Sequence, residues 1–377
     1  MIKLLIMNDL VHDGGVEKVM QEIVNYLSSD IYNITIATIN NDYDSIKKFY
    51  NGGVKYISLE KAFKGNNKNI ITKIYYYVKK RIYRILYKLK FNLEDYDVAI
   101  AIKEGQTMQF LSDVIVKKKF GWVHVDYNYL YWTKSVFKTP ENEIKCMKKY
   151  DNIICVSEAT KESICNTIGN PCNLIVKMNP MNINEIIQKS KKQIDVLKNY
   201  KVKKEKKILI SVGGCRQQKG YIRLLKCCKK LNDMFDYELW IVGDGPEKNE
   251  IESYIKQENL NNIVLWGTQD NPYPFIKKAN WFISASYWES YGLAVQEAFV
   301  LGVPVLATVC PAFKECISND EGILVENTEE ALYRGLYDIL SNPVLEKEKR
   351  QKLNRRTQEE LYNNRLEEIE KLWLEKK

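Results

Sequence analysis

Two glutamates, Glu289 and Glu297, lie eight positions apart in a run that is otherwise mainly apolar, aromatic or glycine. The run follows Trp281–Ser286, which has the pattern of a buried strand, and it ends at Gly302-Val-Pro304, before another apolar strand. Strand, short loop, helix and strand form one step of a parallel α/β sheet. Because open α/β folds bind ligands at the carboxyl ends of their strands, we expect both carboxylates to face one ligand.

The residues between the two glutamates offer a second kind of contact. Gly292 and Leu293 stand where the loop enters the helix. The N–H groups of a first helical turn have no partner inside the helix, and the helix dipole favours a negative charge there. The sequence therefore predicts an anion site beside the two carboxylates.

This Glu-x7-Glu spacing resembles the signature of retaining glycosyltransferases of family 4, which have the GT-B fold. The resemblance rests on motif order along nearly the whole chain. Before the carboxylate pair the motifs are Gly14-Gly15-Val-Glu17, Val-His124-Val-Asp126, Val-Ser157-Glu158, Asn179-Pro180, Val212–Gly220, Val242–Pro246, and Gly267 with Asn271-Pro-Tyr273. It implies an α/β protein of the GT-B class, with two Rossmann-like domains facing each other across a cleft.

A nucleotide-sugar donor carries a diphosphate, which binds cations and unpaired amides. The resemblance implies that Lys219 contacts this diphosphate and that the amides of Gly292 and Leu293 bind the distal phosphate. Arg216 is expected to add a second cation. Family members commonly carry arginine where Gly214 stands, so a surface arginine is the alternative for Arg216.

The resemblance separates the roles of the two glutamates. Glu297 would accept hydrogen bonds from the vicinal hydroxyls of the ribose. Glu289 would contact the donor sugar and respond to the positive charge that develops at its anomeric carbon. A cap or ion pair on the helix surface is the alternative for Glu297, and the apolar residues around it disfavour that role.

In the first half, Gly14 and Gly15 follow the first expected strand and open a helix, where glycine lets the backbone approach a ligand closely. A plain turn is the alternative. His124 ends an apolar strand, and the resemblance places it beside the donor sugar as a catalytic residue. We expect Gly15 to bind the donor, Asp126 to orient His124, and Gly14 and Asp126 to contact sugar or acceptor. A structural histidine is the other interpretation, and the aromatic loop 127–132 fits acceptor stacking and packing equally well.

The apolar strand pattern occurs in two sets separated by a lysine-rich passage. We expect an acceptor-binding Rossmann-like domain at 1–185, a connector at 186–206 and a nucleotide-sugar-binding Rossmann-like domain at 207–345. The charged helical segment 346–377 is expected to cross back to the first domain. The expected strands are 3–7, 34–37, 54–57, 98–101, 119–123, 153–156, 174–177, 207–212, 238–242, 263–265, 281–284, 305–308 and 322–325.

The net charge of +9 is concentrated in one segment. Residues 61–90 contain ten Lys or Arg and no acid, so the remainder of the chain sums to −1. Apolar residues recur in this segment at helical spacing, with tyrosines between them. The pattern predicts a basic amphipathic helix that binds an anionic membrane surface. The alternative is that the apolar stripe packs on the sheet while the lysines face water. Nucleic-acid binding is disfavoured because no recognition motif accompanies the charge.

Composition bears on cofactors and location. Only two histidines are present, so a histidine-based metal site is not expected. Asp42-Tyr-Asp44 and Asp95-Tyr-Asp97 look like the metal motif of the other large glycosyltransferase fold, but each stands in a polar turn, and we expect neither a metal nor another cofactor. The scattered cysteines are typical of reduced thiols. We expect a cytoplasmic protein, peripheral at the inner face of the cell membrane.

The expected activity is metal-independent, retaining hexosyl transfer from a nucleotide sugar to a lipid-linked or glycan acceptor in cell-surface polysaccharide biosynthesis. A UDP-sugar is the commoner donor in such enzymes, and a GDP-sugar is the alternative. The rival from another class is a catalytically inactive GT-B subunit that binds a nucleotide sugar and partners an active transferase. A GT-B epimerase would need further acids, and a phosphorylase would need a pyridoxal-bearing lysine motif.

Overall fold

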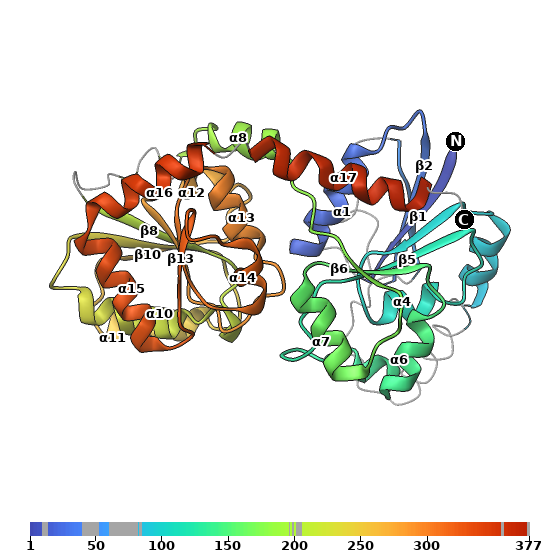
Figure 1. Cartoon of the computed structure of the whole chain (residues 1–377), viewed down its shortest axis with the longest axis horizontal. Coiled ribbons are helices and arrows are strands. Elements are labelled where there is room, and N and C mark those ends of the chain that lie inside the picture. Colours follow the sequence, from blue (N-terminus) through green and yellow to red (C-terminus); the bar gives the residue numbers. More distant parts are fainter. Residues whose placement is uncertain are drawn as a thin grey trace. The chain divides into compact units, whose positions relative to one another are not determined.

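The computed structural model describes residues 1–9, 14–39, 53–59, 82, 85–195, 197, 200, 206–355 and 358–374. These form two compact units, one of Met1–Met181 with Asn363–Lys377 and the other of Asn182–Tyr362. In each unit a parallel sheet has helices on both of its faces (Figure 1). The division at residue 181 falls just before the expected connector 186–206.

The sheet of the first unit has the strand order β3-β2-β1-β4-β5-β6-β7. Its strands are β1 (Ile2–Asn8), β2 (Tyr32–Thr38), β3 (Lys55–Ser58), β4 (Val98–Ala101), β5 (Lys118–Val123), β6 (Asn152–Cys155) and β7 (Leu174–Val176). Its helices include α1 (Gly15–Tyr26), α4 (Gln106–Leu111), α5 (Lys134–Phe137), α6 (Pro140–Met147) and α7 (Glu158–Ile168). The winding direction reverses between β1 and β4, so their carboxyl ends form the switch point at which such sheets bind ligands.

The sheet of the second unit has the order β10-β9-β8-β11-β12-β13. Its strands are β8 (Lys207–Val212), β9 (Tyr237–Val242), β10 (Ile263–Gly267), β11 (Trp281–Ser284), β12 (Val305–Thr308) and β13 (Gly322–Val325). Its helices are α8 (Ile183–Ser190), the short η1 (Gln217–Lys219), α10 (Tyr221–Leu231), α11 (Lys248–Gln257), α12 (Tyr273–Lys278), α13 (Leu293–Val300), α14 (Pro311–Cys316), α15 (Glu329–Ser341) and α16 (Pro343–Arg355). Here the switch point lies between β8 and β11.

All thirteen expected strands are present, with both ends within two residues of the expected positions. They form because short runs of Val, Ile, Leu and aromatic residues can be buried on both faces of a parallel sheet. Every residue of β4, β9, β11 and β12 is buried. The fold class predicted from the sequence, α/β with two parallel sheets, is confirmed.

The charged C-terminal segment forms two helices. In α16, Arg350 donates to the carbonyl oxygens of Gly302 and Ala279, within the second unit. The following helix, α17 (Gln358–Leu374), packs on the first unit through Trp373, whose ring centroid lies 6.3 Å from that of Phe120. The part of this helix from Asn363 onward therefore belongs to the first unit.

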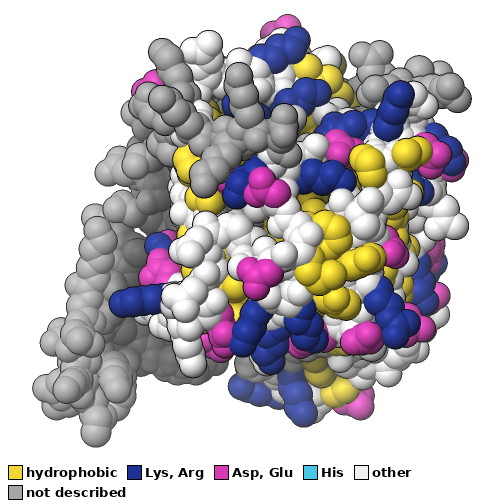
Figure 2. Space-filling model, turned by 90° about the vertical axis from the view of Figure 1, so that its left-hand side faces the viewer, with side chains coloured by type: hydrophobic (Ala, Val, Ile, Leu, Met, Phe, Trp, Pro, Cys, Tyr) yellow, Lys and Arg dark blue, Asp and Glu magenta, His cyan; other side chains and the backbone are white. Residues whose placement is uncertain are grey.

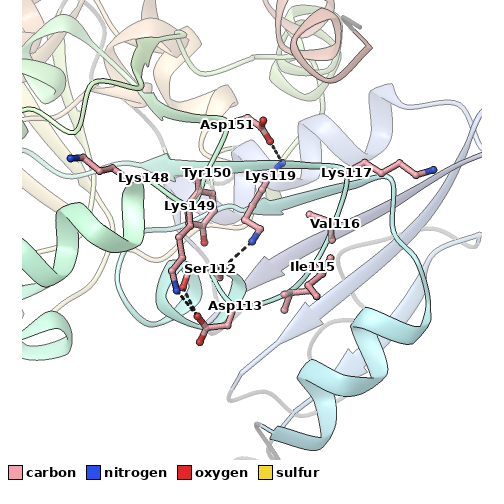
Figure 3. Close-up of a pocket in the computed structure, with 11 residues that line it drawn as sticks. Ser112, Asp113, Ile115, Val116, Lys117, Lys119, Lys148, Lys149, Tyr150 and Asp151 are labelled. Atoms are coloured by element: carbon pink, nitrogen blue, oxygen red, sulfur yellow. Dashed lines mark hydrogen bonds and ion pairs between the residues drawn. The ribbon is translucent and has the colours of Figure 1, made fainter. Parts of the chain in front are cut away.

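A pocket of about 440 Å³ opens in the first unit, before β5 and β6 begin (Figure 3). Its lining includes the four lysines Lys117, Lys119, Lys148 and Lys149. Lys149 forms an ion pair with Asp113 at 2.8 Å. The pocket lies at the amino ends of the strands, away from the carboxyl edge that carries the switch point.

In the second unit, the face drawn in Figure 2 carries cationic and anionic side chains interspersed with apolar groups.

Candidate active site

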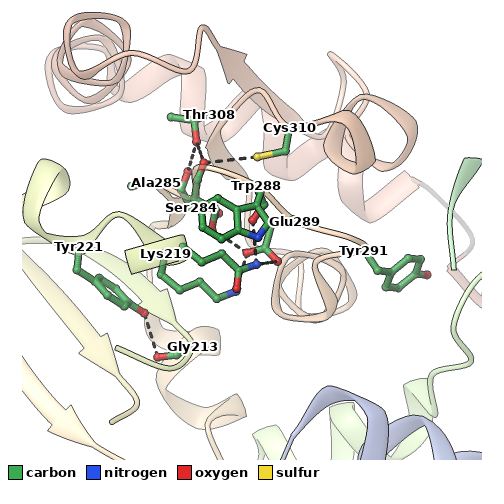
Figure 4. Close-up of polar contacts among 12 residues, drawn as sticks. Gly213, Lys219, Tyr221, Ser284, Ala285, Trp288, Glu289, Tyr291, Thr308 and Cys310 are labelled. Carbon is green, nitrogen blue, oxygen red and sulfur yellow. Dashed lines mark hydrogen bonds and ion pairs between the residues drawn. The ribbon is translucent and has the colours of Figure 1, made fainter. Parts of the chain in front are cut away.

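An ion pair joins the two loops at the switch point of the second sheet. Lys219 ends η1, in the connection that follows β8, and Glu289 lies in the loop that follows β11. Lys219 Nζ is 2.6 Å from Glu289 Oε1 (Figure 4). Glu289 is buried, and a quarter of the Lys219 side chain is exposed. The structure thus places a cation and a carboxylate at the edge of the sheet where a ligand is expected.

Neighbouring side chains orient the Glu289 carboxylate. Ser286 Oγ donates to Glu289 Oε1 at 2.7 Å, so this oxygen accepts from both Ser286 and Lys219. Gln218 Nε2 approaches Oε2 at 3.5 Å and also donates to the carbonyl oxygen of Trp288 at 2.9 Å. Charge-assisted hydrogen bonds of this kind fix both the distance and the direction of a carboxylate.

The helix α13 begins directly after this loop, as the sequence predicts. Gly292 is its N-cap, with φ of +81°, and no side chain caps the helix. A Cβ atom at this position would lie 2.4 Å from Phe313 Cε1, so only glycine fits. Leu293 is half-buried in the first turn, and Glu297 is buried one turn further along. Val295 N–H donates to the Gly292 carbonyl, and no side chain caps the amides that precede it in this turn.

Arg216 lies at the surface, as the residue before η1. Its side chain occupies the space beside Gly214, because a Cβ atom added to Gly214 would lie 3.5 Å from Arg216 Nε. Arg216 therefore occupies the space next to the position where family members commonly carry their arginine.

The first unit has its own polar cluster at the switch point, and sequence reasoning missed most of it. Asp9 follows β1 and forms an ion pair with Lys103, which follows β4, at 3.0 Å. Glu104 is buried and accepts from the backbone N–H of His124 and from Trp132 Nε1, both at 3.0 Å. The available signal was position, since Lys103 and Glu104 stand two and three residues after the predicted strand 98–101.

His124 is held as a neutral imidazole. Its Nε2 lies 2.9 Å from the carbonyl oxygen of Ile102, and a carbonyl only accepts, so Nε2 carries the proton. The ring stacks on Trp122 at an interplanar angle of 13°. Burial lowers the pKa of His124 to about 3. In this tautomer Nδ1 keeps its lone pair and can accept a hydrogen bond from a hydroxyl group.

This burial predicts a pH dependence of stability. The pKa of His124 is lowered from 6.5 to about 3 on folding, so as the pH falls the unfolded chain takes up the proton first. The titration of His124 therefore lowers the free energy of unfolding as the pH falls below about 6.5, by up to about 1.4 kcal/mol per pH unit. Urea unfolding of His124→Gln is expected to show a shallower loss than wild type between pH 6.5 and 4.5. Equal slopes for the two proteins would contradict the neutral assignment.

The other predicted residues of the first unit lie near the same edge. Gly14 is the N-cap of α1, with extended backbone at φ of −158°, and Gly15 is the first helical residue. Asp126 is buried, and its Oδ1 accepts from the backbone N–H of Asn128 at 2.9 Å, within the aromatic loop. The hydrogen bond of the His124 ring is with the Ile102 carbonyl, and the orienting role of Asp126 stays a prediction.

No group of three or more His, Cys, Asp or Glu side chains able to hold a metal ion occurs in the described part of the chain. Asp95 lies in a turn with φ of +50°, and Asp97 accepts from the backbone N–H of Lys3 and from Lys117 Nζ. This second Asp-x-Asp string therefore forms the boundary before β4. The first, Asp42 and Asp44, lies outside the described residues.

Residues 193–360 match the family model described as Glycosyl transferases group 1. The matched stretch lies within the second unit, which is therefore similar to that family. A Haemophilus influenzae glycosyltransferase is 25% identical over 347 residues, 88% of each chain. A Methanocaldococcus jannaschii glycosyltransferase is 30% identical over 204 residues, which are 53% of this chain and 50% of that protein. The chain thus spans only half the length of the latter.

A Campylobacter jejuni N-acetylgalactosaminyltransferase named for a diphospho-undecaprenol substrate is 30% identical over 145 residues, 37% of this chain and 39% of that protein. Among solved structures, Anabaena HepE in complex with UDP and glucose has a TM-score of 0.73 at 14% identity, covering 94% of each chain. S. aureus TarM in complex with UDP, fondaparinux and α-GlcNAc-glycerol also has a TM-score of 0.73, at 16% identity, covering 99% of this chain and 100% of TarM. At these identities the likeness shows the fold alone, which is GT-B.

Proposed function

We propose that this protein is a group 1 glycosyltransferase that transfers a sugar, with retention and without a metal, from a UDP-sugar to a lipid-linked or glycan acceptor in cell-surface polysaccharide biosynthesis. The observation that carries the proposal is the Lys219–Glu289 pair at the switch point, next to the uncapped start of α13. The structures of HepE and TarM both contain UDP, which supports the choice of nucleotide. The diphospho-undecaprenol in the name of the Campylobacter relative supports a lipid-linked acceptor.

In this proposal the second unit binds the donor. Lys219 and Arg216 neutralise the diphosphate, and the amides of Gly292 and Leu293 bind its distal phosphate. Glu297 accepts from the ribose hydroxyls. Negative charge grows on the diphosphate as the sugar departs, so these preorganised donors stabilise the transition state more than the bound substrate.

The reaction retains configuration when the acceptor attacks the face from which the diphosphate leaves. The bond between the anomeric carbon and the diphosphate oxygen breaks, and a bond from the acceptor oxygen to that carbon forms. The acceptor proton moves to the departing phosphate oxygen, so no other base is required. Glu289 stabilises the positive charge on the sugar, and neutral His124 accepts a hydrogen bond from a sugar hydroxyl through Nδ1.

Thermal unfolding with UDP, GDP and a panel of their sugars tests the proposal. A bound nucleotide at 100 times its dissociation constant is expected to add about 2.7 kcal/mol of stability. Stabilisation by GDP but not by UDP would identify a GDP-sugar as the donor in place of a UDP-sugar. No stabilisation by any nucleotide would overturn the proposal. Release of UDP on addition of a lipid-linked acceptor would separate a transferase from the inactive binding subunit.

We also propose that the protein works in the cytoplasm, docked on the anionic inner face of the cell membrane. No described helix is long and apolar enough to cross a bilayer. The segment 61–90 lies mostly outside the described residues, but 82 and 85–90 are described, and 85–93 are helical. The apolar side chains on one face of this stretch are at least half exposed, namely Ile82, Ile85, Leu86, Leu89 and Leu93.

Residues on the opposite face of the helix 85–93 attach it to the first unit. Tyr87 and Phe91 pack in the core of the first unit, so the stripe of exposed apolar residues points away from the sheet. Ile115 is 75% exposed, and its backbone N–H donates to Asn92 at the end of the same helix. Lys88 reaches from the helix to Asp113 of the four-lysine pocket. An exposed apolar stripe beside clustered lysines suits an anionic lipid surface and disfavours the alternative that the stripe packs on the sheet.

Replacing Leu86 and Leu89 by serine is expected to lower binding to vesicles that contain anionic phospholipid at least tenfold. Each buried leucine contributes about 1.5–3 kcal/mol, which sets this lower limit. Sedimentation with phosphatidylglycerol and with phosphatidylcholine vesicles measures the effect and separates charge from apolar contact. The matched control is Met234→Ser with Val344→Ser, two residues of similar exposure in the second unit. Equal partitioning of the two variants would count against membrane docking.

A further inference from the structure

The loop that carries Glu289 is held by an unusual number of side chains from other elements. Four successive backbone carbonyls, those of residues 285–288, each accept a hydrogen bond from a side chain. The pairs are Ala285 with Arg223 Nε at 2.8 Å, Ser286 with Thr308 Oγ1 at 2.6 Å, Tyr287 with Asn327 Nδ2 at 2.8 Å and Trp288 with Gln218 Nε2 at 2.9 Å. The path of the backbone before Glu289 is therefore fixed residue by residue.

Arg223 is the centre of this arrangement. It stands in the first turn of α10 and is 5% exposed. Besides the Ala285 carbonyl, its guanidinium donates to Asn327 Oδ1 at 2.7 Å and to Thr308 Oγ1 at 3.1 Å. It also lies 3.9 Å from the centre of the Tyr287 ring. Arg223 thus contacts the loop directly and orients two of the side chains that hold it.

The Ala285 carbonyl also connects the loop to the backbone segment that carries Lys219. A Cβ atom at Gly220 would lie 2.1 Å from the Ala285 carbonyl oxygen, so the backbone after Lys219 rests directly on the atom that Arg223 binds. The backbone N–H of Tyr287 also donates to the Gln218 carbonyl at 2.8 Å. The backbone segments that carry Lys219 and Glu289 are therefore in direct contact with each other.

We infer that Arg223 is a positioning residue that holds the loop 285–289 so that Glu289 is presented to the sugar of the donor. We call the hydrogen bonds of Arg223 to this loop and to its supporting side chains the clamp, and the clamp depends only on the contacts described above. Its effect on sugar transfer rests on the proposed function. Ser286, inside the clamped loop, transmits the constraint because its Oγ donates to Glu289 Oε1. Lysine cannot reproduce the several directed donors of a planar guanidinium, so Arg223→Lys is expected to restore function only partly.

Hydrogen exchange tests the clamp without any ligand. In Arg223→Met the amides of 285–291 are expected to exchange at least tenfold faster, while those of β8 and β9 keep their protection. Lys226→Met, an exposed position on the same helix, is the matched control and is expected to leave the loop unchanged. Unchanged exchange in 285–291, or a uniform increase throughout the second unit, would overturn the inference.

Turnover tests the consequence. With the nucleotide sugar that gives the largest thermal stabilisation, kcat of Arg223→Met is expected to fall about 100-fold, and Arg223→Lys should recover part of it. Binding of UDP alone is expected to change less than threefold. A parallel loss of UDP affinity would show that Arg223 acts on the nucleotide instead of Glu289, and would overturn the positioning role. If wild type binds no nucleotide, the proposed function fails while the exchange experiment still decides the clamp.

Discussion

Replacing Lys219 by methionine is expected to lower kcat/KM for sugar transfer by about 10²–10³-fold. The substitution keeps an unbranched side chain that is one atom shorter and removes the charge next to the position proposed for the diphosphate. Since that charge interacts most strongly when the leaving group is most negative, its loss raises the transition state more than the bound donor. Weaker UDP binding is expected as well, because part of the contact exists before reaction.

Steady-state release of UDP and calorimetric titration with UDP measure the two effects. Lys226→Met is the control, since Lys226 is exposed and lies on α10 two turns from Lys219. Thermal unfolding should show a loss of stability as well, because the buried Glu289 carboxylate loses its cationic partner and keeps only its hydrogen bonds from Ser286 and Gln218. Full transfer activity in the Lys219 variant would remove the basis of the proposed donor site.

The sequence predicted the strands well because their burial is encoded locally. β4, β8, β11, β12 and β13 have the predicted bounds, and each is a short run of apolar residues that a parallel sheet covers on both faces. Short helices were harder to anticipate. Helices α5 and α14 have four and six residues, which is too short for helical periodicity to be recognised.

The candidate site was predictable only in part, for a reason of topology. The sequence indicated Lys219 and Glu289 separately, each in a loop that follows a strand. Their contact depends on β11 lying beside β8, although β9 and β10 come between them in the chain. Arg223 had no signal, because it lies among apolar residues of an amphipathic helix and its partners are backbone and side-chain oxygens 62 to 104 positions away.

The same argument applies to the first unit. His124 was recognised from a motif, whereas Glu104 was not, because its contacts with His124 and Trp132 arise only when β4 and β5 pair. The basic segment 61–90 shows the opposite case. Its composition indicated an amphipathic helix, but only side-chain exposure at residues 82 and 85–93 decides which way the described part of the apolar stripe points.

Replacing Glu289 by glutamine is expected to separate catalysis from nucleotide binding. The amide keeps the shape of the side chain and its bond from Ser286, but it removes the negative charge that is proposed to stabilise the sugar as its bond to the diphosphate breaks. We therefore expect kcat to fall by about 10²-fold. Glu326→Gln, an exposed position in the same unit, is the control for loss of an acidic charge.

Binding of UDP alone should respond in the other direction. Lys219 lies 2.6 Å from Glu289 in the free protein, so a diphosphate has to share this cation with the carboxylate. Removing the carboxylate charge leaves Lys219 available to the phosphates, and UDP is expected to bind Glu289→Gln as tightly as wild type or more tightly. Calorimetric titration with UDP measures the affinity, and a turnover assay measures kcat on the same protein. If UDP affinity instead falls together with kcat, Glu289 is part of the nucleotide site, and the division of labour between the two members of the pair is wrong.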